Sequence, residues 1–364
     1  MHWRGWNWLL GWVALGGLGL SMPANSASRL RAGTAGRSPA MPGPAHGRRD
    51  PSRMQMQSQC VECHPMQAQQ WVESGHAKAF TAPTVQRAFE QEPRAFCRGC
   101  HAPEADPRRT TPAEAAAVGV ACVSCHVVDG EILAGTEPSS DAPASPHAVR
   151  RDPAFTTARA CARCHEFGFT DVHARRRPEL MQSTVSEHRR SPYADVSCAQ
   201  CHMPRVDGHR DHSFTASRDP ELLRRAVRVE AQRPSACTLE LSLTPVGVGH
   251  AFPTGDLMRR IEVRATTSDQ TWSSTRYLAR HWGGARPLGT LVRVMVADDR
   301  VGPGPEPRIV RFELPANRCD EPVKWSARYQ RVQEIPGENE AAAVVVGEIT
   351  LAAGTLARLP KVIR

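Results

Sequence analysis

Apolar residues alternate with polar ones, or run together at strand length, in the part of the chain that follows residue 226. Turns that carry glycine or proline separate these runs, as is typical of antiparallel strands. The runs are residues 239–243, 261–264, 291–296, 309–314, 344–346 and 349–351. Several short strands at this spacing predict an antiparallel β-sandwich-like domain over residues 227–364.

Residues 58–226 carry helix signals and little strand alternation. Thr111–Glu114 reads Thr-Pro-Ala-Glu, which has the form of a capping box with proline at the first helical position. Asp219 precedes Pro220 in a similar way, and residues 180–188 place apolar side chains at helical spacing. We therefore expect short helices joined by long loops up to residue 226, and a mixed fold for the whole chain.

The N-terminus has the pattern of an export signal. Arg4 precedes an apolar stretch from Trp8 to Leu20, and small residues follow it. Because so short a stretch spans a bilayer poorly, we predict a cleaved signal peptide over residues 1–27, with an uncleaved anchor as the alternative. Residues 28–57 are rich in Ser, Ala, Gly, Pro and Arg, which predicts a disordered linker.

The formal charge of +9 does not indicate nucleic-acid binding. Residues 1–57 hold seven Arg and one Asp, so they account for +6 and leave +3 for the rest of the chain. No basic helix with interleaved aromatic residues occurs in the sequence, and aromatic residues make up only 5% of it. We therefore expect no nucleic-acid partner.

The motif Cys-x-x-Cys-His occurs five times between residues 60 and 202. Its members are Cys60, Cys63 and His64; Cys97, Cys100 and His101; Cys122, Cys125 and His126; Cys161, Cys164 and His165; and Cys198, Cys201 and His202. This is the attachment signature of c-type haem. The two thiols add to the two vinyl groups of one porphyrin, and the adjacent histidine then reaches the iron. The sequence therefore predicts five covalently bound haem c groups.

Zinc and a disulfide framework are the alternatives for paired cysteines, but neither requires a histidine after every second cysteine. The motifs start 37, 25, 39 and 37 residues apart. Haems held at this spacing cannot each have a separate protein core, so we expect them to pack against one another.

Four further segments resemble bacterial multihaem c-type cytochromes related to the tetrahaem electron carrier of nitrifiers, hydroxylamine oxidoreductase and the pentahaem nitrite reductase. They are residues 71–77, 119–126, 191–204 and 249–255, and the resemblance covers most of residues 58–265. It implies electron transfer through closely packed haems, most of which have two histidine ligands.

Four histidines outside the motifs are predicted as second axial ligands. His76 and His250 lie in segments that match the family. His147 follows Ser-Pro in a loop after the third motif, and His212 precedes Ser-Phe after the fifth. A ligand at His250 would attach the β domain to the haem domain.

The fifth iron is left with alternatives. His173 and His209 are both candidates, and an open haem is the other solution. His188 is predicted to pack and His281 to be structural. Met203 directly follows His202 and cannot reach the opposite face of its own haem, and no other methionine has a better claim.

Cys237 and Cys319 lie outside the motifs, in the predicted β domain. In an oxidising compartment they can pair, and the alternative is two free buried thiols. No sequence rule positions them, so the disulfide remains a hypothesis.

We predict a periplasmic or otherwise exported electron carrier with a quinol-linked or soluble donor and a periplasmic acceptor; peripheral membrane contact fits such a donor. One alternative is an enzyme that converts a small nitrogen or sulfur compound at an open haem. In another, the β domain docks a partner and the haems only connect it. Every motif ends in histidine, so no haem has the lysine of many pentahaem nitrite reductases, which favours the carrier. Donor, acceptor, potentials and oligomeric state stay open.

Overall fold

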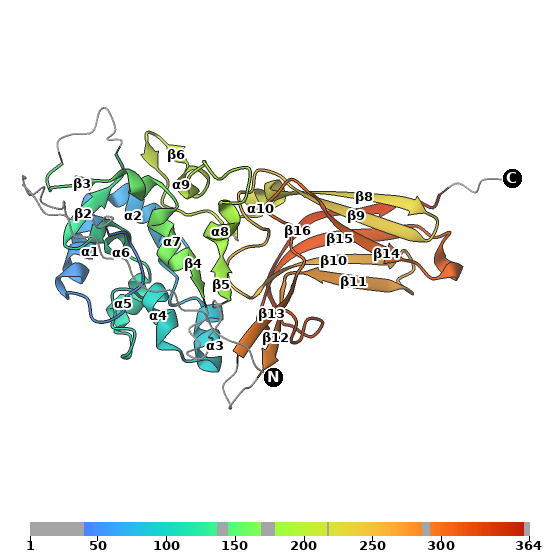
Figure 1. Cartoon of the computed structure of the whole chain (residues 1–364), viewed down its shortest axis with the longest axis horizontal. Coiled ribbons are helices and arrows are strands. Elements are labelled where there is room, and N and C mark those ends of the chain that lie inside the picture. Colours follow the sequence, from blue (N-terminus) through green and yellow to red (C-terminus); the bar gives the residue numbers. More distant parts are fainter. Residues whose placement is uncertain (1–39, 137–144, 169–178, 217, 286–291, 360–364) are drawn as a thin grey trace, which may run out of the picture. The chain divides into compact units, whose positions relative to one another are not determined.

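The computed structural model describes residues 40–136, 145–168, 179–216, 218–285 and 292–359. The predicted signal peptide, the first part of the predicted linker and His173 lie outside these residues. Within them, short helices come first along the chain and long antiparallel strands follow (Figure 1). This order agrees with the predicted mixed fold.

Short helices surround the Cys-x-x-Cys-His motifs. They are α1 (Ser52–Cys63), α2 (Pro65–Val72), α3 (Pro83–Gln91), α4 (Ala95–His101), α5 (Ala113–Val118), α6 (Cys122–His126), α7 (Arg159–His165), α8 (Thr184–His188), α9 (Cys198–His202) and α10 (Pro220–Ala226), with the 3-10 turns Pro153–Thr156 and Ala316–Arg318. Among the described helices, none has the length and apolar content needed to cross a membrane.

Small strands lie between these helices, and long strands follow them. The small ones are β1 (Val127–Val128), β2 (Glu131–Ala134), β3 (Arg150–Arg151), β4 (Glu166–Gly168), β5 (Leu180–Ser183), β6 (Arg205–Val206) and β7 (His209–Arg210). The others are β8 (Val227–Ser235), β9 (Thr238–Pro245), β10 (Arg259–Thr267), β11 (Ser273–Leu278), β12 (Arg280–Ala285), β13 (Val292–Asp298), β14 (Arg308–Glu313), β15 (Val323–Val332) and β16 (Val345–Leu356).

Two antiparallel sheets share one apolar core in the C-terminal part. One sheet has the order β11-β10-β15-β16 and the other β14-β9-β8. Strand β9 shows most clearly why the two sheets pack together. Its residues Leu239, Leu241 and Leu243 alternate with polar residues and are fully buried. They pack with Phe312 of β14 and Tyr329 of β15. Each buried leucine contributes about 1.5–3 kcal/mol to this core.

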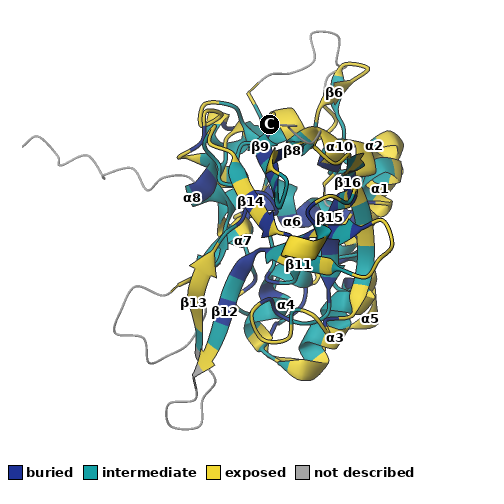
Figure 2. Ribbon diagram, turned by 90° about the vertical axis from the view of Figure 1, so that its right-hand side faces the viewer, coloured by how far each residue is buried: buried dark blue, intermediate teal, exposed yellow. Residues whose placement is uncertain are grey.

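The predicted strand at residues 291–296 exists but does not enter that core. β13 pairs with β12 in a separate two-stranded sheet. Val294, Met295 and Val296 are exposed, and β13 is yellow along most of its length in Figure 2. The apolar run therefore predicted a strand correctly, although its apolar side chains remain exposed.

Two predicted helix features differ in the structure. Residues 180–183 form strand β5, which pairs with β4, and only residues 184–188 are helical. Helix α5 begins at Ala113 with Pro112 as its N-cap, and the Thr111 hydroxyl has no hydrogen-bond partner, so the capping box does not form. The Asp219 carboxylate, in contrast, accepts a hydrogen bond from Leu222 N at 2.8 Å and caps α10.

The predicted linker over residues 28–57 is too long, because its described part is folded. Met41 and Ala45 are buried, and α1 begins at Ser52. Ala45 N donates to Gly99 O at 2.8 Å, and a side-chain carbon at Gly99 would lie only 2.6 Å from the Ala45 carbonyl oxygen. Residues 40–49 thus pack on the second motif as an ordered segment. Their polar composition gave no sign of this packing.

Cys237 and Cys319 form a disulfide with their Cα atoms 4.4 Å apart. The bond joins the turn between β8 and β9 to the 3-10 turn before β15. The two cysteines are therefore paired and are not the two free buried thiols that the sequence left as the alternative.

Candidate functional site

Each Cys-x-x-Cys-His motif ends on one turn of helix. The second cysteine and histidine close α4, α6, α7 and α9, and α1 ends at Cys63 directly before His64. Residues three apart on a helix lie on the same face, so both thiols of a motif point to one side. Cys63 and Cys201 are exposed, and the other eight motif cysteines are partly buried.

A second imidazole faces four of the five motif histidines. The ring centres of His64 and His147 are 6.4 Å apart, and those of His76 and His165 are 6.1 Å apart. The corresponding distances are 6.3 Å for His126 with His212 and 6.2 Å for His202 with His250. The structure therefore places all four predicted second ligands opposite motif histidines, each from a different part of the chain.

These separations match two nitrogens bound on opposite sides of one metal ion. A metal–imidazole bond of about 2.0 Å, with the ring centre about 1.1 Å beyond its nitrogen, places the ring centres about 6.2 Å apart. The residues present thus fit an iron held between two imidazoles.

Hydrogen bonds select the nitrogen that such a metal needs. Nδ1 of five of these histidines contacts a backbone carbonyl: His101 with Ala79 at 2.7 Å, His126 with Leu133 at 2.8 Å, His202 with Thr215 at 2.9 Å, His212 with Arg210 at 2.8 Å and His250 with Ala251 at 3.0 Å. A proton on Nδ1 leaves the lone pair on Nε2 as the ligand. Burial lowers the pKa of His76 to about 3 and that of His250 to about 4, which keeps both rings neutral.

The donor set suits haem better than zinc. Among the residues that the structure describes, no three Cys, His, Asp or Glu side chains converge as a zinc site requires. Each motif instead offers two thiols next to one histidine, and in four motifs a second imidazole lies opposite that histidine. This arrangement matches a haem that is attached by thioether bonds and whose iron has two histidine ligands.

Contacts between motifs show which of them are neighbours. A hydrogen bond with Cys164 and burial raise the pKa of Cys100, and Cys161 and Cys198 are related in the same way. Cys60 packs in the apolar cluster that contains Val123 of the third motif. Burial, with a smaller effect of Cys164, raises the pKa of Cys125 to about 12. Motif 1 therefore lies beside motif 3, and motif 4 lies beside motifs 2, 3 and 5.

His76 is held by the segment before the third motif. Val120 N donates to His76 O at 2.9 Å, and Trp71 Nε1 donates to Val120 O at 2.8 Å. Gly119 has φ +54°, and a side-chain carbon there would lie 2.6 Å from the carbonyl oxygens of His76 and Ala77. Glycine is thus needed both for the backbone conformation and for the close approach.

We expect Gly119→Ala to displace His76 and to change the spin state of one haem, the one held by His165. The clash involves two backbone carbonyls, so the chain must move at the ligand itself. Low-temperature EPR of the oxidised protein measures this change. Gly208→Ala is the matched control, because its φ is +81° but no atom lies within 4 Å of the added carbon. It should cost about 1 kcal/mol of stability and leave the spectrum unchanged; identical spectra for both variants would contradict the role of Gly119.

The motif of His101 differs from the other four. The ring beside His101 is that of Phe89, 6.1 Å away, and among the described residues no histidine faces it. His209, one candidate for this place, instead contacts Gln70 and the Asp207 carbonyl. The other candidate, His173, lies outside the described residues.

The two histidines predicted as structural have protein partners. The His188 ring lies against Gly249, where an added carbon would be 3.0 Å from Cδ2. His281 bridges Asp299 and Glu340, and its Nε2 is 2.9 Å from the Asp299 carboxylate. The hydrogen bond with Asp299 raises the pKa of His281.

Comparisons with known proteins agree with this geometry. Residues 59–127 match the family described as Cytochrome c554 and c-prime. Among solved structures, the chain is similar to a penta-heme cytochrome c552 from Thermochromatium tepidum, with a TM-score of 0.61 and 21% identity over 86% of this chain and 100% of that chain. No curated protein matches the chain. At this identity the structural likeness shows a shared fold. Together with the motifs, the matches support a multihaem c-type cytochrome with covalently bound haem.

Proposed function

We propose that the chain is an exported pentahaem c-type cytochrome that transfers electrons between redox partners. The observation that carries the proposal is the set of four imidazole pairs, 6.1–6.4 Å apart, in which each pair includes one motif histidine. Haem supplies one-electron redox chemistry when bound. At these four sites two imidazoles would occupy the iron and leave no place for a substrate, which favours electron exchange.

In this proposal the chain attaches, orients and insulates the haems. The ten motif cysteines would hold the haems through thioether bonds, and the motif histidines together with His76, His147, His212 and His250 would supply imidazole ligands to the irons. Histidine opposite histidine gives lower potentials than methionine would. Because motif 4 adjoins motifs 2, 3 and 5, electrons that enter at motif 1 would pass through motifs 3 and 4 before the path divides.

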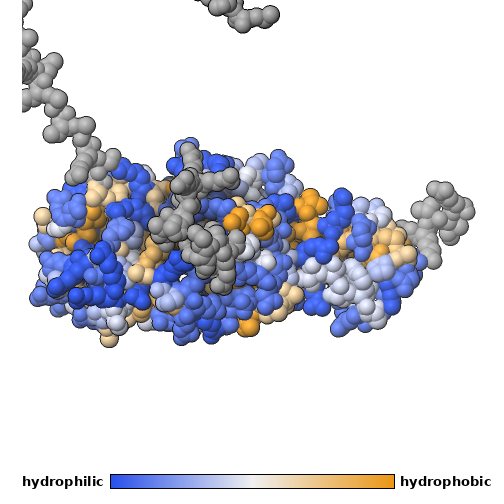
Figure 3. All heavy atoms as spheres, turned by 60° about the horizontal axis from the view of Figure 1, so that its bottom comes forward, coloured by the Kyte–Doolittle hydropathy of each residue, from blue (hydrophilic) through white to orange (hydrophobic). Residues whose placement is uncertain are grey.

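Export to the periplasm, loss of the signal peptide and redox protein partners are further parts of the proposal. The Cys237–Cys319 disulfide supports an oxidising compartment. The face of the protein in Figure 3 is mostly hydrophilic with small separated apolar spots, which suits brief docking of a soluble donor or acceptor more than a permanent interface. We also place the chain in the superfamily of the nitrifier tetrahaem cytochrome and hydroxylamine oxidoreductase, on the segments quoted above.

A second candidate function is reduction or oxidation of a small nitrogen or sulfur compound at the haem of His101. The observation in its favour is that Phe89, rather than a described histidine, lies beside His101. An open iron at this position would accept a small ligand, although an open haem alone does not establish catalysis.

EPR and turnover measurements together test the proposal. The oxidised protein should show mostly low-spin iron, with at least four irons in that state. The reduced protein mixed with nitrite, hydroxylamine or nitric oxide should be reoxidised slowly and without sustained turnover. Intact mass should show five haem additions and loss of the leader. Rapid, saturable consumption of any of the three compounds would replace the carrier by the enzyme, and a mass without haem would contradict both.

A further inference from the structure

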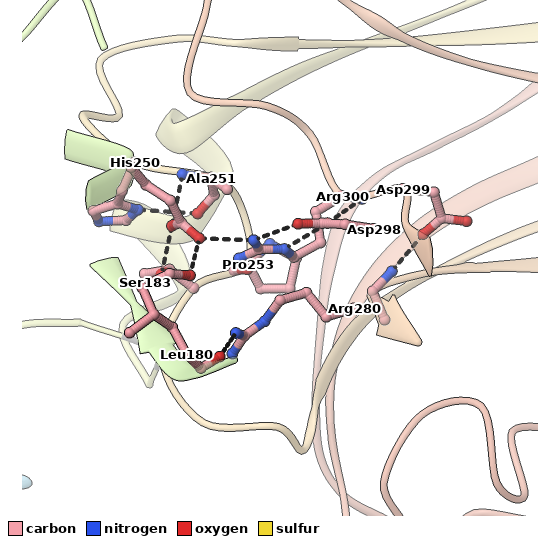
Figure 4. A network of polar contacts seen from close by, with 12 residues as sticks. Leu180, Ser183, His250, Ala251, Pro253, Arg280, Asp298, Asp299 and Arg300 are labelled. Carbon is pink, nitrogen blue, oxygen red and sulfur yellow. Dashed lines mark hydrogen bonds and ion pairs between the residues drawn. The ribbon is translucent and has the colours of Figure 1, made fainter. Parts of the chain in front are cut away.

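The His250 ligand lies on a loop between β9 and β10 that is held from two sides (Figure 4). On one side are β5 and α8, which belong to the haem-binding part of the chain. On the other are Arg280 at the start of β12 and residues 298–300, which end β13 and directly follow it. The polar contacts in Figure 4 join these elements through the loop.

Glu187 is the centre of these contacts. Its side chain, which is almost fully buried, accepts hydrogen bonds from Ala251 N at 3.2 Å, Thr254 Oγ1 at 2.9 Å and Ser183 Oγ at 2.6 Å. Burial alone would raise the pKa of Glu187, but Arg300 and these hydroxyl groups outweigh it and hold the pKa below its usual range. The residue is therefore a buried carboxylate bound to the ligand loop.

Arg300 completes the arrangement from the β part. Its guanidinium donates to Glu187 at 2.7 Å and to the Pro253 carbonyl at 3.0 Å, and it pairs with Asp298 at 2.8 Å. Arg280 donates to the Leu180 carbonyl at 2.9 Å on the opposite side. Every donor of Arg300 thus acts either on Glu187, on the loop itself or on its own segment.

These contacts reach the imidazole through one residue, Ala251. Ala251 N donates to Glu187, and the carbonyl of the same residue lies 3.0 Å from Nδ1 of His250. A shift of Glu187 therefore moves the group that orients the ring. The His250 ring is nearly parallel to that of His202, with an angle of 6° between their planes, whereas the angle between His76 and His165 is 72°.

A buried ion pair by itself adds little stability, because both charges lose their hydration. The hydrogen bonds of such a pair are directional, however, so they fix the relative positions of the groups they join, which an apolar contact does not. We propose that Glu187 and Arg300 are positioning residues for the His250 ligand, and that they couple the coordination of the His202 iron to the β part of the chain. This rests on the proposed function, because it requires haem between His202 and His250.

Carbon monoxide binding to the reduced holoprotein tests the proposal, because the gas reaches this iron only when His250 dissociates. Glu187→Gln keeps the size of the side chain but removes its charge, and it should raise the binding rate at one haem about tenfold. Arg300→Met should do the same, whereas Arg300→Lys keeps the charge and should stay within about threefold of the wild type. EPR of oxidised Glu187→Gln should show an altered low-spin signal for the pair with parallel rings only.

Arg233→Met is the matched control. Arg233 is a nearly buried arginine of the β part that donates to the carbonyls of Ala236, Cys319 and Glu321. It lies beside the turn between β8 and β9, whereas the His250 loop follows the other end of β9. Arg233→Met should lower the melting temperature but leave the carbon monoxide rate unchanged. If Glu187→Gln and Arg300→Met behave like Arg233→Met, the ion pair is only structural and the proposal fails.

His250→Ala separates this failure from that of the proposed function. A new high-spin haem in His250→Ala, with unchanged rates in Glu187→Gln, would refute the positioning role alone. An unchanged spin count in His250→Ala would refute the ligand assignment on which the proposal rests.

Discussion

Replacing His250 with alanine is expected to convert one of the five irons from low spin to high spin and to lower the melting temperature of the β part. The ring lies 6.2 Å from that of His202, the distance that two axial ligands require, and the loss of the bond leaves an open position. Spin quantification by low-temperature EPR measures the first effect, and calorimetry measures the second.

His209→Ala is the control for this substitution. His209 contacts Gln70 and the Asp207 carbonyl and faces no described motif histidine, so its loss should leave the spin count unchanged. His147→Ala should open the His64 haem without loosening the β part. Equal spin counts for the wild type and His250→Ala would contradict the assignment.

Removal of the disulfide in the double variant Cys237→Ser and Cys319→Ser should destabilise the β part by about 4 kcal/mol. The bond closes a loop with a sequence separation of 82 residues, and long loops lose the most entropy when they are closed. Denaturant unfolding followed by far-ultraviolet circular dichroism measures this loss.

The haem spectrum serves as the internal control, because both cysteines lie outside the five motifs. It should be unchanged under native conditions. A double variant as stable as the wild type would show that the loop is already constrained by packing, and a changed spectrum would show that the bond also supports a haem.

Strong local patterns predicted the structure well. The alternation in residues 239–243 became β9, and Asp219 caps α10 as its position before proline indicated. The local sequence pattern failed where a pairing strand determines the secondary structure. Leu180–Ser183 has helical spacing but forms β5, because Glu166–Gly168 offers an edge to pair with.

Other elements were missed in the sequence. Strand β15 was not predicted, although Val323, Trp325, Ala327 and Tyr329 alternate with polar residues and pack in the core. Its polar face includes the buried Gln330, which accepts a hydrogen bond from buried Arg260 at 2.8 Å. Residues 40–49 likewise read as a linker because their order depends on one close approach to Gly99.

Histidine pairing could be predicted only in part. The composition identified which histidines were free to serve as second ligands, but spacing did not identify the partner of each. His76 follows His64 by 12 residues and yet faces His165, which lies 89 residues further along the chain. Glu187 gave no sequence signal, because its role depends on a loop more than 60 residues away.

The contacts between cysteines of different motifs have a consequence for the maturation of this protein. In the folded chain Cys100 lies against Cys164, and Cys161 lies against Cys198. In an oxidising compartment, a chain that folded before haem attachment would bring these thiols together and join the wrong pairs by disulfides. Thioether formation removes both thiols of a motif from this chemistry. Attachment before the motifs close on one another would avoid these disulfides, whereas Cys237 and Cys319 lie outside the motifs and pair with each other.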